Sequence, residues 1–274
     1  MKKLSLLIAL LPLLGACEQK KHQPWLGYGE GDTAYISAPQ PGWVTVLKIE
    51  RGALVHRGDL LFVLDSVYEQ AGAQQAVANL AQARAGLEQE IANLAYAKTT
   101  LDRQNQLARD NAGTPTQRDL ALSNYRQSEA RIAQLRSQIA QMQAGLTSAN
   151  YGLGQRDVVA QTEGRVQDIY FREGEYVPAA TPVVAVLPPK NVFVRFFVPE
   201  PDLPRIKLGG TVRITCDGCK AMDAKVTFLA AREEFTQPVI FSQGNREKLV
   251  FKAEARLPQG LDLHPGQPVE VRPL

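Results

Sequence analysis

Apolar side chains recur every seven residues through the middle of the chain, in one series over 67–109 and a second over 117–155. The first series contains Leu80, Leu87, Leu94, Leu101 and Ala108, and the second contains Tyr125, Ile132, Ile139, Leu146 and Leu153, with Leu135 and Met142 offset by three. Two helices with seven-residue seams predict a coiled coil. We therefore expect an α-helical hairpin over 67–155.

The residues between these two series predict where the chain turns back. Gly113 can end the first helix in a left-handed conformation, which glycine adopts without steric cost. Thr114 is placed to act as the N-cap, Pro115 suits the first helical position, and Gln117 stands where a capping box has Glu or Gln. We expect the second helix to begin here.

Short β-branched runs punctuated by glycine and proline flank the hairpin on both sides, over 35–66 and 156–189, and the two flanks resemble each other. Five pairs of like residues are 122 positions apart: Ala38 and Ala160, Gly42 and Gly164, Val44 and Val166, Gly52 and Gly174, and Val55 and Val177. A constant offset indicates an internal repeat. We expect the two halves to pair into one β sandwich, with glycines at the sharp bends.

Strand-like runs alternate with glycine and proline turns over 190–274, which predicts a small β-barrel. The expected fold class is therefore α+β, with a split β sandwich, an inserted helical hairpin and a barrel. Residues 17–34 are assigned to an N-terminal linker.

Residues 1–16 have the layout of a secretory signal peptide, in which two lysines precede a short apolar stretch. That stretch has about 11 residues, against roughly 20 for a bilayer-spanning helix. The sequence Leu14-Gly15-Ala16-Cys17 resembles the bacterial lipobox, which implies that Cys17 becomes the first mature residue and carries a diacylglycerol. A plain signal peptide with a chance cysteine is the alternative.

Charge argues against a nucleic-acid partner. The chain has 31 Lys and Arg and 28 Asp and Glu, a formal net charge of +3. Loss of the two signal-peptide lysines leaves a charge near +1, which is not the basic footprint of a nucleic-acid-binding protein.

Cys216 and Cys219 are the remaining cysteines. A single C-x-x-C supplies two thiols where a structural zinc ion takes four ligands, and the three histidines are far away in sequence. We expect a disulfide that closes the turn at Asp217 and Gly218, and no metal site.

The motifs of common enzyme classes are missing. We find no phosphate-binding Gly-rich Lys loop, no nucleophile elbow and no histidine pair at metal-ligand spacing. Glu233 and Glu234 are adjacent carboxylates, but neighbours on a strand point to opposite faces. We expect no enzymatic activity and no cofactor.

These segments together resemble the periplasmic adaptors, or membrane fusion proteins, of the haemolysin-D type. The segments 38–42 and 51–59 look like the first half of the family's split biotinyl-lipoyl-like domain, and 198–203 and 264–271 look like recurring pieces of its β-barrel. The resemblance implies an adaptor that links an inner-membrane transporter to a TolC-like outer-membrane channel for export. It also implies a ring of copies, hexameric in many members, in the periplasm.

The resemblance extends to the family's channel-docking motif at the hairpin tip. Arg103, Leu107, Thr114, Asp119 and Ala121 stand at the motif's intervals, with Thr114 in place of the usual Ser. The alternative is that Thr114 only caps the helix, Leu107 fills the seam, and the two charged residues are solvated. Residues 234–238 resemble a segment of adaptors that work with ABC exporters, which favours that transporter class.

Two other functions are weighed against the adaptor. A lipoyl or biotin carrier needs a lysine at the turn joining its two half-motifs, whereas Lys98, the only lysine in 67–155, lies within a predicted helix. A periplasmic coiled-coil chaperone or structural tether would expose apolar residues at a tip that is mainly polar here. The membrane that receives the Cys17 lipid, inner or outer, stays open.

Overall fold

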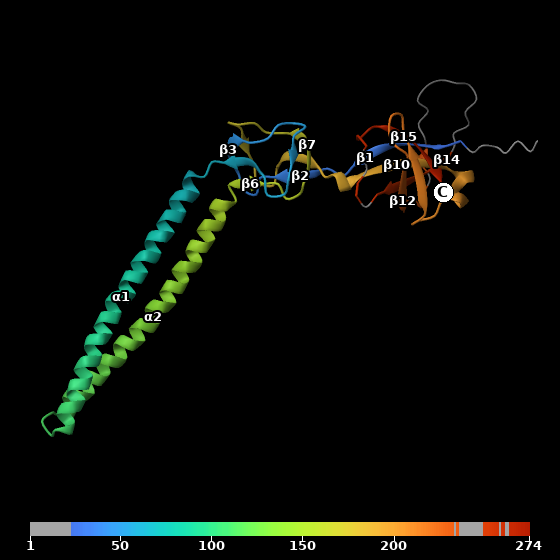
Figure 1. Ribbon diagram of the computed structural model, residues 1–274. Helices are drawn as coiled ribbons and strands as arrows, with labels where there is room; N and C mark the ends of the chain where they lie inside the picture. Colours follow the sequence, from blue (N-terminus) through green and yellow to red (C-terminus); the bar gives the residue numbers. More distant parts are fainter. Residues whose placement is uncertain (1–22, 233, 236–248, 258, 261–262) are drawn as a thin grey trace, which may run out of the picture. The chain divides into compact units, whose positions relative to one another are not determined.

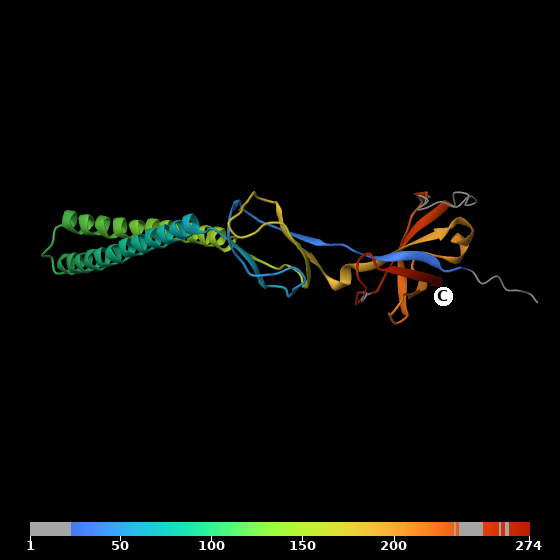
Figure 2. The same cartoon turned by 90° about the horizontal axis from the view of Figure 1, so that it is seen from above.

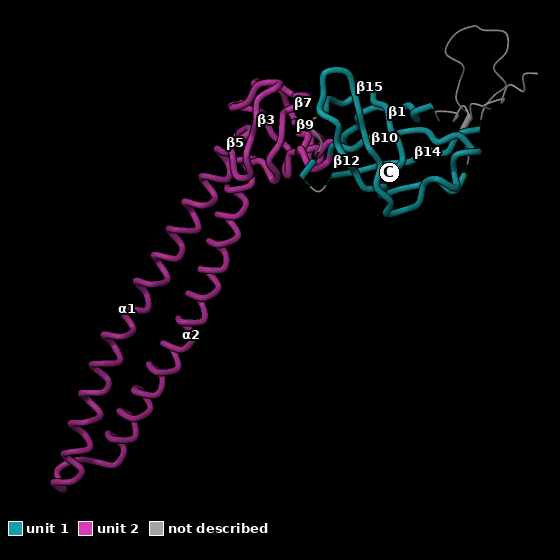
Figure 3. Tube along the Cα trace, turned by 45° about the vertical axis from the view of Figure 1, so that its right-hand side comes forward, with its two compact units in different colours: residues 1–31, 192–274 teal, residues 32–191 magenta. Residues whose placement is uncertain are grey.

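The computed structural model describes residues 23–232, 234–235, 249–257, 259–260 and 263–274. Cys17 and the signal peptide therefore lie outside the described residues. The chain forms two compact units (Figure 3): one is Asp32–Asn191, and the other joins the chain up to Gly31 with Val192–Leu274. No described helix is both long and apolar enough to cross a membrane.

Two long helices form the predicted hairpin and run side by side in both views (Figures 1 and 2). They are α1 (Val67–Arg109) and α2 (Pro115–Gly154). The heptad positions form the seam between them: Leu80, Ile132 and Leu135 are buried, while the other positions of both series are half-buried. The remaining helical surface is mostly exposed and polar, so burial of a narrow apolar stripe holds the hairpin together.

The two flanks of the hairpin form a β sandwich in the same unit. Its strands are β2 (Ala34–Ser37), β3 (Gly42–Leu47), β4 (Leu54–Val55), β5 (Leu60–Leu64), β6 (Asp157–Val159), β7 (Gly164–Ile169), β8 (Tyr176–Val177) and β9 (Pro182–Leu187). One sheet has the order β2-β9-β7-β4 and the other β6-β5-β3-β8. A shift of 122 residues converts each sheet into the other, so the sequence repeat is a structural repeat.

The repeat extends to single backbone hydrogen bonds. The Gly52 amide donates to the Val166 carbonyl at 2.9 Å, and the Gly174 amide donates to the Val44 carbonyl at 2.8 Å. Both glycines have positive φ, 84° and 82°, so the predicted sharp bends occur at these two positions. The halves thus exchange equivalent contacts about an approximate twofold axis.

Both halves contribute aliphatic side chains to the buried core of the sandwich, which also contains Phe62. Phe62, Leu61 and Leu64 are fully buried and pack with valines that include Val44 and Val166. Burial of such side chains contributes about 1.5–3 kcal/mol each, and neither half can supply it alone. The sandwich therefore requires both ends of the hairpin to return to one place.

The second unit is a closed barrel of six strands. They are β1 (Trp25–Gly31), β10 (Val192–Pro199), β11 (Thr211–Thr215), β12 (Met222–Leu229), β14 (Leu249–Arg256) and β15 (Pro268–Pro273), with a short β13 (Glu234–Phe235) beside β14. The order β10-β1-β15-β11-β12-β14 closes because β14 also pairs with β10. Short 3-10 helices cover Pro189–Asn191 and Glu200–Arg205. The expected small barrel is confirmed.

Strand β1 lies within the segment expected to be a linker, 17–34. It fills the space between β10 and β15 and so completes the barrel. Its Trp25 is 2% exposed, stacks on Phe196 at 5.9 Å, and donates its indole N–H to Asp202 at 2.9 Å. The sequence did not predict this strand because glycine occupies every second position, 27, 29 and 31. Glycine has no side chain, so the alternation of apolar and polar residues that marks a strand is missing.

Candidate functional site at the hairpin tip

The chain reverses between α1 and α2 through a left-handed residue, but not the one expected. Asn111 has φ 54°, whereas Gly113 does not have positive φ. Asparagine adopts this conformation more readily than other residues with a side chain. Gly113 is small for a different reason: a Cβ there would lie 3.2 Å from the Leu107 Cβ. The predicted left-handed Gly113 is therefore wrong.

Thr114 begins the second helix as expected. Its backbone is extended, with φ −94° and ψ 143°, and its hydroxyl accepts a hydrogen bond from the Gln117 amide at 3.3 Å. Pro115 occupies the first turn, where its missing N–H leaves no helical bond unmade. The capping role of Thr114 is confirmed, and its side chain is exposed beside the turn.

The other four motif residues fall into two groups. Arg103 and Asp119 are exposed, and Asp119 pairs with Arg118 at 3.3 Å. Leu107 is half-buried, and Ala121 is only 5% exposed, inside the seam. Ala121 therefore sets how closely the two helices approach and is not itself presented to a partner.

Leu120 is the large apolar side chain that the tip does expose, at 62%. It lies between the motif residues Asp119 and Ala121, at a position that belongs neither to the motif nor to the heptad seam. A leucine outside the heptad series is expected to point away from the seam, so the sequence could have predicted that Leu120 is exposed. The exposed tip thus combines a leucine with charged and hydroxyl groups.

A groove of about 520 Å³ lies beside the seam and ends at Ala121. Side chains of both helices line it, among them Asn93, Ala97, Thr100, Ala121, Asn124 and Ser128. The small side chains among them, Ala97, Ala121 and Ser128, fill little of the space between the two helices. Sequence reasoning missed the groove.

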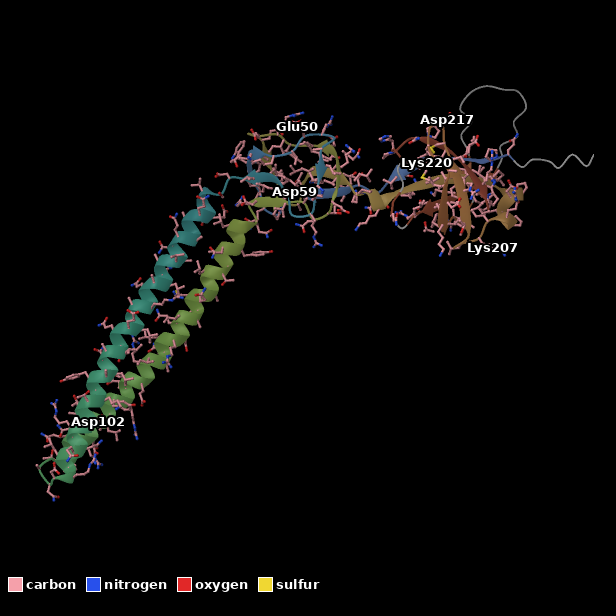
Figure 4. All side chains as sticks on the ribbon, viewed as in Figure 1. Glu50, Asp59, Asp102, Lys207, Asp217 and Lys220 are labelled. Carbon is pink, nitrogen blue, oxygen red and sulfur yellow. A yellow bond between two sulfur atoms is a disulfide. The ribbon has the colours of Figure 1, made fainter. Side chains whose placement is uncertain are left out.

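Charged groups on the hairpin pair locally. Lys98 and Asp102 lie one helical turn apart with their side chains 3.3 Å apart, and Figure 4 shows Asp102 near the distal end of α1. A hydrogen bond with Glu129 raises the pKa of the Tyr125 hydroxyl, and partial burial raises it further. These charged and hydroxyl groups are thus paired within the hairpin.

The cysteine pair lies in the barrel unit. Cys216 and Cys219 form a disulfide across Asp217 and Gly218, and Gly218 has φ 80°. The Gln267 side-chain amide donates to the Cys216 sulfur at 3.4 Å. This disulfide closes the turn after β11.

Proteins of known sequence show similarity to this chain, although no protein-family profile matches it. A UPF0194 membrane protein of Acidithiobacillus ferridurans is 31% identical over 123 residues, which are 44% of this chain and 36% of that protein. The macrolide export protein MacA of Escherichia coli O157:H7 is 28% identical over 177 residues, 64% of this chain and 48% of MacA. The matched segment thus spans about a third of the UPF0194 protein and about half of MacA.

Two solved structures share the fold. The crystal structure of MacA from Actinobacillus actinomycetemcomitans superposes with a TM-score of 0.72 at 20% identity, over 91% of this chain and 78% of that one. The membrane fusion protein Spr0693 from Streptococcus pneumoniae R6 gives 0.57 at 17% identity, over 91% and 97%. Both likenesses cover the hairpin and the β domains together, because they extend over nine tenths of this chain.

Proposed function

We propose that the chain is a membrane fusion protein that acts as a non-enzymatic periplasmic adaptor of an export system. It would link an inner-membrane transporter, of the ABC type, to a TolC-like outer-membrane channel. The observation that carries the proposal is the hairpin itself. A long solvated coiled coil, inserted into a β sandwich and ending in a capped polar turn, presents a surface far from its base.

The tip supplies the chemistry for docking to a helical channel. Arg103 and Asp119 offer charged hydrogen-bonding groups, and Leu120 offers an apolar knob. An apolar side chain can enter a groove between channel helices while the polar groups bond its rim. Thr114 and Ala121 act indirectly: the first fixes the start of α2 and the second fixes the helix spacing.

The remaining parts have supporting roles in this proposal. Cys17 carries the lipid that holds the chain at a membrane of the cell envelope, inner or outer. The sandwich, which we interpret as lipoyl-like from its internal repeat, stacks with copies of itself in a hexameric ring, and the barrel contacts the transporter. The free energy for export comes from the transporter.

Photo-crosslinking in cells tests the proposal. A photo-reactive residue at Gln117, exposed in the first turn of α2, is compared with one at Glu88, exposed midway along α1. We expect Gln117 to capture an outer-membrane channel with a transporter in the same complex, and Glu88 to capture no channel. Cys17→Ser, which removes the lipid site, should weaken recovery of the complex without changing the tip's partner.

The chaperone alternative predicts a different result from the same experiment. Capture of many unrelated soluble proteins at Gln117, with no channel among them, would reject the adaptor and favour a coiled-coil chaperone. Equal channel capture at Gln117 and Glu88 would place the contact on the hairpin side and not at its tip.

A further inference from the structure

Arg156 is the one charged side chain that the fold buries, among the residues that the structure describes; it is 9% exposed. It follows the last turn of α2 and precedes strand β6. A buried guanidinium loses its hydration, so it is retained only where hydrogen bonds or a counter-charge replace the lost water. Its partners therefore indicate what it holds together.

The Arg156 side chain joins both helices of the hairpin to the sandwich. One terminal nitrogen donates to the Pro41 carbonyl at 2.8 Å, in the turn before β3. The other is paired with the carboxylate of Glu69, in the first turn of α1, and that side chain is 15% exposed. Arg156 itself is attached to the end of α2, so three separate segments meet at one guanidinium.

The backbone around Arg156 is shaped to receive it. A Cβ on Gly42 would lie 2.8 Å from the Arg156 Nη1, so a larger residue there would displace the guanidinium. The Arg156 carbonyl accepts a hydrogen bond from the Leu64 amide at 2.9 Å, which fixes its backbone to β5. The repeat-equivalent Gly164 instead faces the Leu187 backbone. The space at Gly42 therefore serves the hairpin base and is not a general property of the repeat.

We propose that Arg156 is a positioning residue that fixes the direction in which the hairpin leaves the sandwich. Two charge-assisted contacts at fixed angles resist tilting of the helix pair better than apolar packing, which is not directional. The lever is long, since the 40 residues of α2 extend about 60 Å, and a tilt of roughly 10° at the base moves the tip by about 10 Å. The position at which the tip docks then depends on the contacts of Arg156 with Glu69 and Pro41. This consequence rests on the proposed function.

Distance measurement between spin labels tests the proposal. Labels are placed on Thr116→Cys at the tip and Glu163→Cys on the sandwich, both exposed, in the full chain carrying Cys17→Ser. The test variant Arg156→Met with Glu69→Leu removes both charges together, which leaves no unpaired buried ion. We expect the distance distribution to broaden roughly twofold while the melting temperature does not fall, because replacing a buried ion pair by apolar residues of similar volume is often neutral or stabilising.

Two further variants make the result decisive. Lys98→Met with Asp102→Leu removes an exposed ion pair of the hairpin and should leave the distribution unchanged. Glu69→Gln preserves the shape of the side chain and should broaden the distribution even if the double variant fails to fold. An unchanged distribution in Glu69→Gln and in any folded Arg156 variant would overturn the proposal.

The outcome is separable from that of the adaptor function. If the wild-type tip captures no channel, the adaptor function fails while the distance result still reports on Arg156. If the tip captures a channel equally well in Glu69→Gln and the distribution stays narrow, the function stands and the positioning role fails.

Discussion

At the scale of single residues, one ion pair of the sandwich links stability to pH. The Asp168 Oδ1 accepts from the Arg51 Nε at 2.7 Å and from the Ile169 amide at 2.7 Å. The Arg51 hydrogen bond, followed by the Ile169 amide, lowers the pKa of Asp168 below its ordinary value of 3.8. A carboxylate with a lowered pKa stabilises the fold above its unfolded-state pKa, and that contribution is lost as pH falls through the folded-state value.

Asp168→Asn should therefore lower the melting temperature of the sandwich at pH 7, because it removes the charge that Arg51 binds. The difference from wild type should begin to narrow below pH 3.8, where the unfolded carboxylate is protonated, and should disappear as pH falls through the lower folded-state pKa of Asp168. Thermal unfolding followed between pH 7 and pH 2 measures this. Glu50→Gln, at an exposed carboxylate next to Arg51, is the control. A constant difference between Asp168→Asn and wild type at every pH would contradict the electrostatic cause.

At the scale of elements, local packing decides which glycines can be replaced. A Cβ on Gly164, at the start of β7, would lie 2.5 Å from the Leu187 carbonyl oxygen, so the strand pair would have to separate. Gly145 lies within α2 with open space around its Cα. The space around each Cα therefore decides whether a side chain can be added there.

Gly164→Ala should destabilise the sandwich by about 1–3 kcal/mol, the usual cost of overpacking. Gly145→Ala should stabilise the hairpin by roughly 0.8–1 kcal/mol, since alanine favours the helix over glycine. Hydrogen exchange read on peptides from β9 and from α2 separates the two effects. Loss of protection in the Gly145 variant would show that the hairpin seam needs the smaller residue.

At the scale of the whole molecule, strand β1 decides whether the barrel closes. It pairs with β10 on one side and β15 on the other, and its Trp25 lies in the barrel core. The strand comes from the N-terminal end of the chain, whereas all other barrel strands follow the sandwich. The barrel therefore cannot be complete until sequence-distant segments meet.

Trp25→Ala should destabilise the barrel by about 3–5 kcal/mol, the typical cost of emptying a buried aromatic site. Peptides from β10 and β15 should lose protection from hydrogen exchange, while peptides from β5 and β9, in the other compact unit, should keep theirs. Leu26→Ala, at a neighbouring side chain that is 70% exposed, should change little. Equal loss of protection in both units would show that they unfold together.

The sequence by itself determined the hairpin, its capped second helix and the repeated halves of the sandwich. Those features depend on spacing within a helix, on contacts three residues apart and on similarity between two segments, all of which are visible along one chain. Only the tertiary structure decided the roles of Trp25 in the barrel, of Asn111 at the turn, of Ala121 in the seam and of Arg156 at the hairpin base. Each of these depends on which distant backbone lies beside the residue, and the pairing partner of a strand or a buried charge is not encoded in its neighbours in sequence.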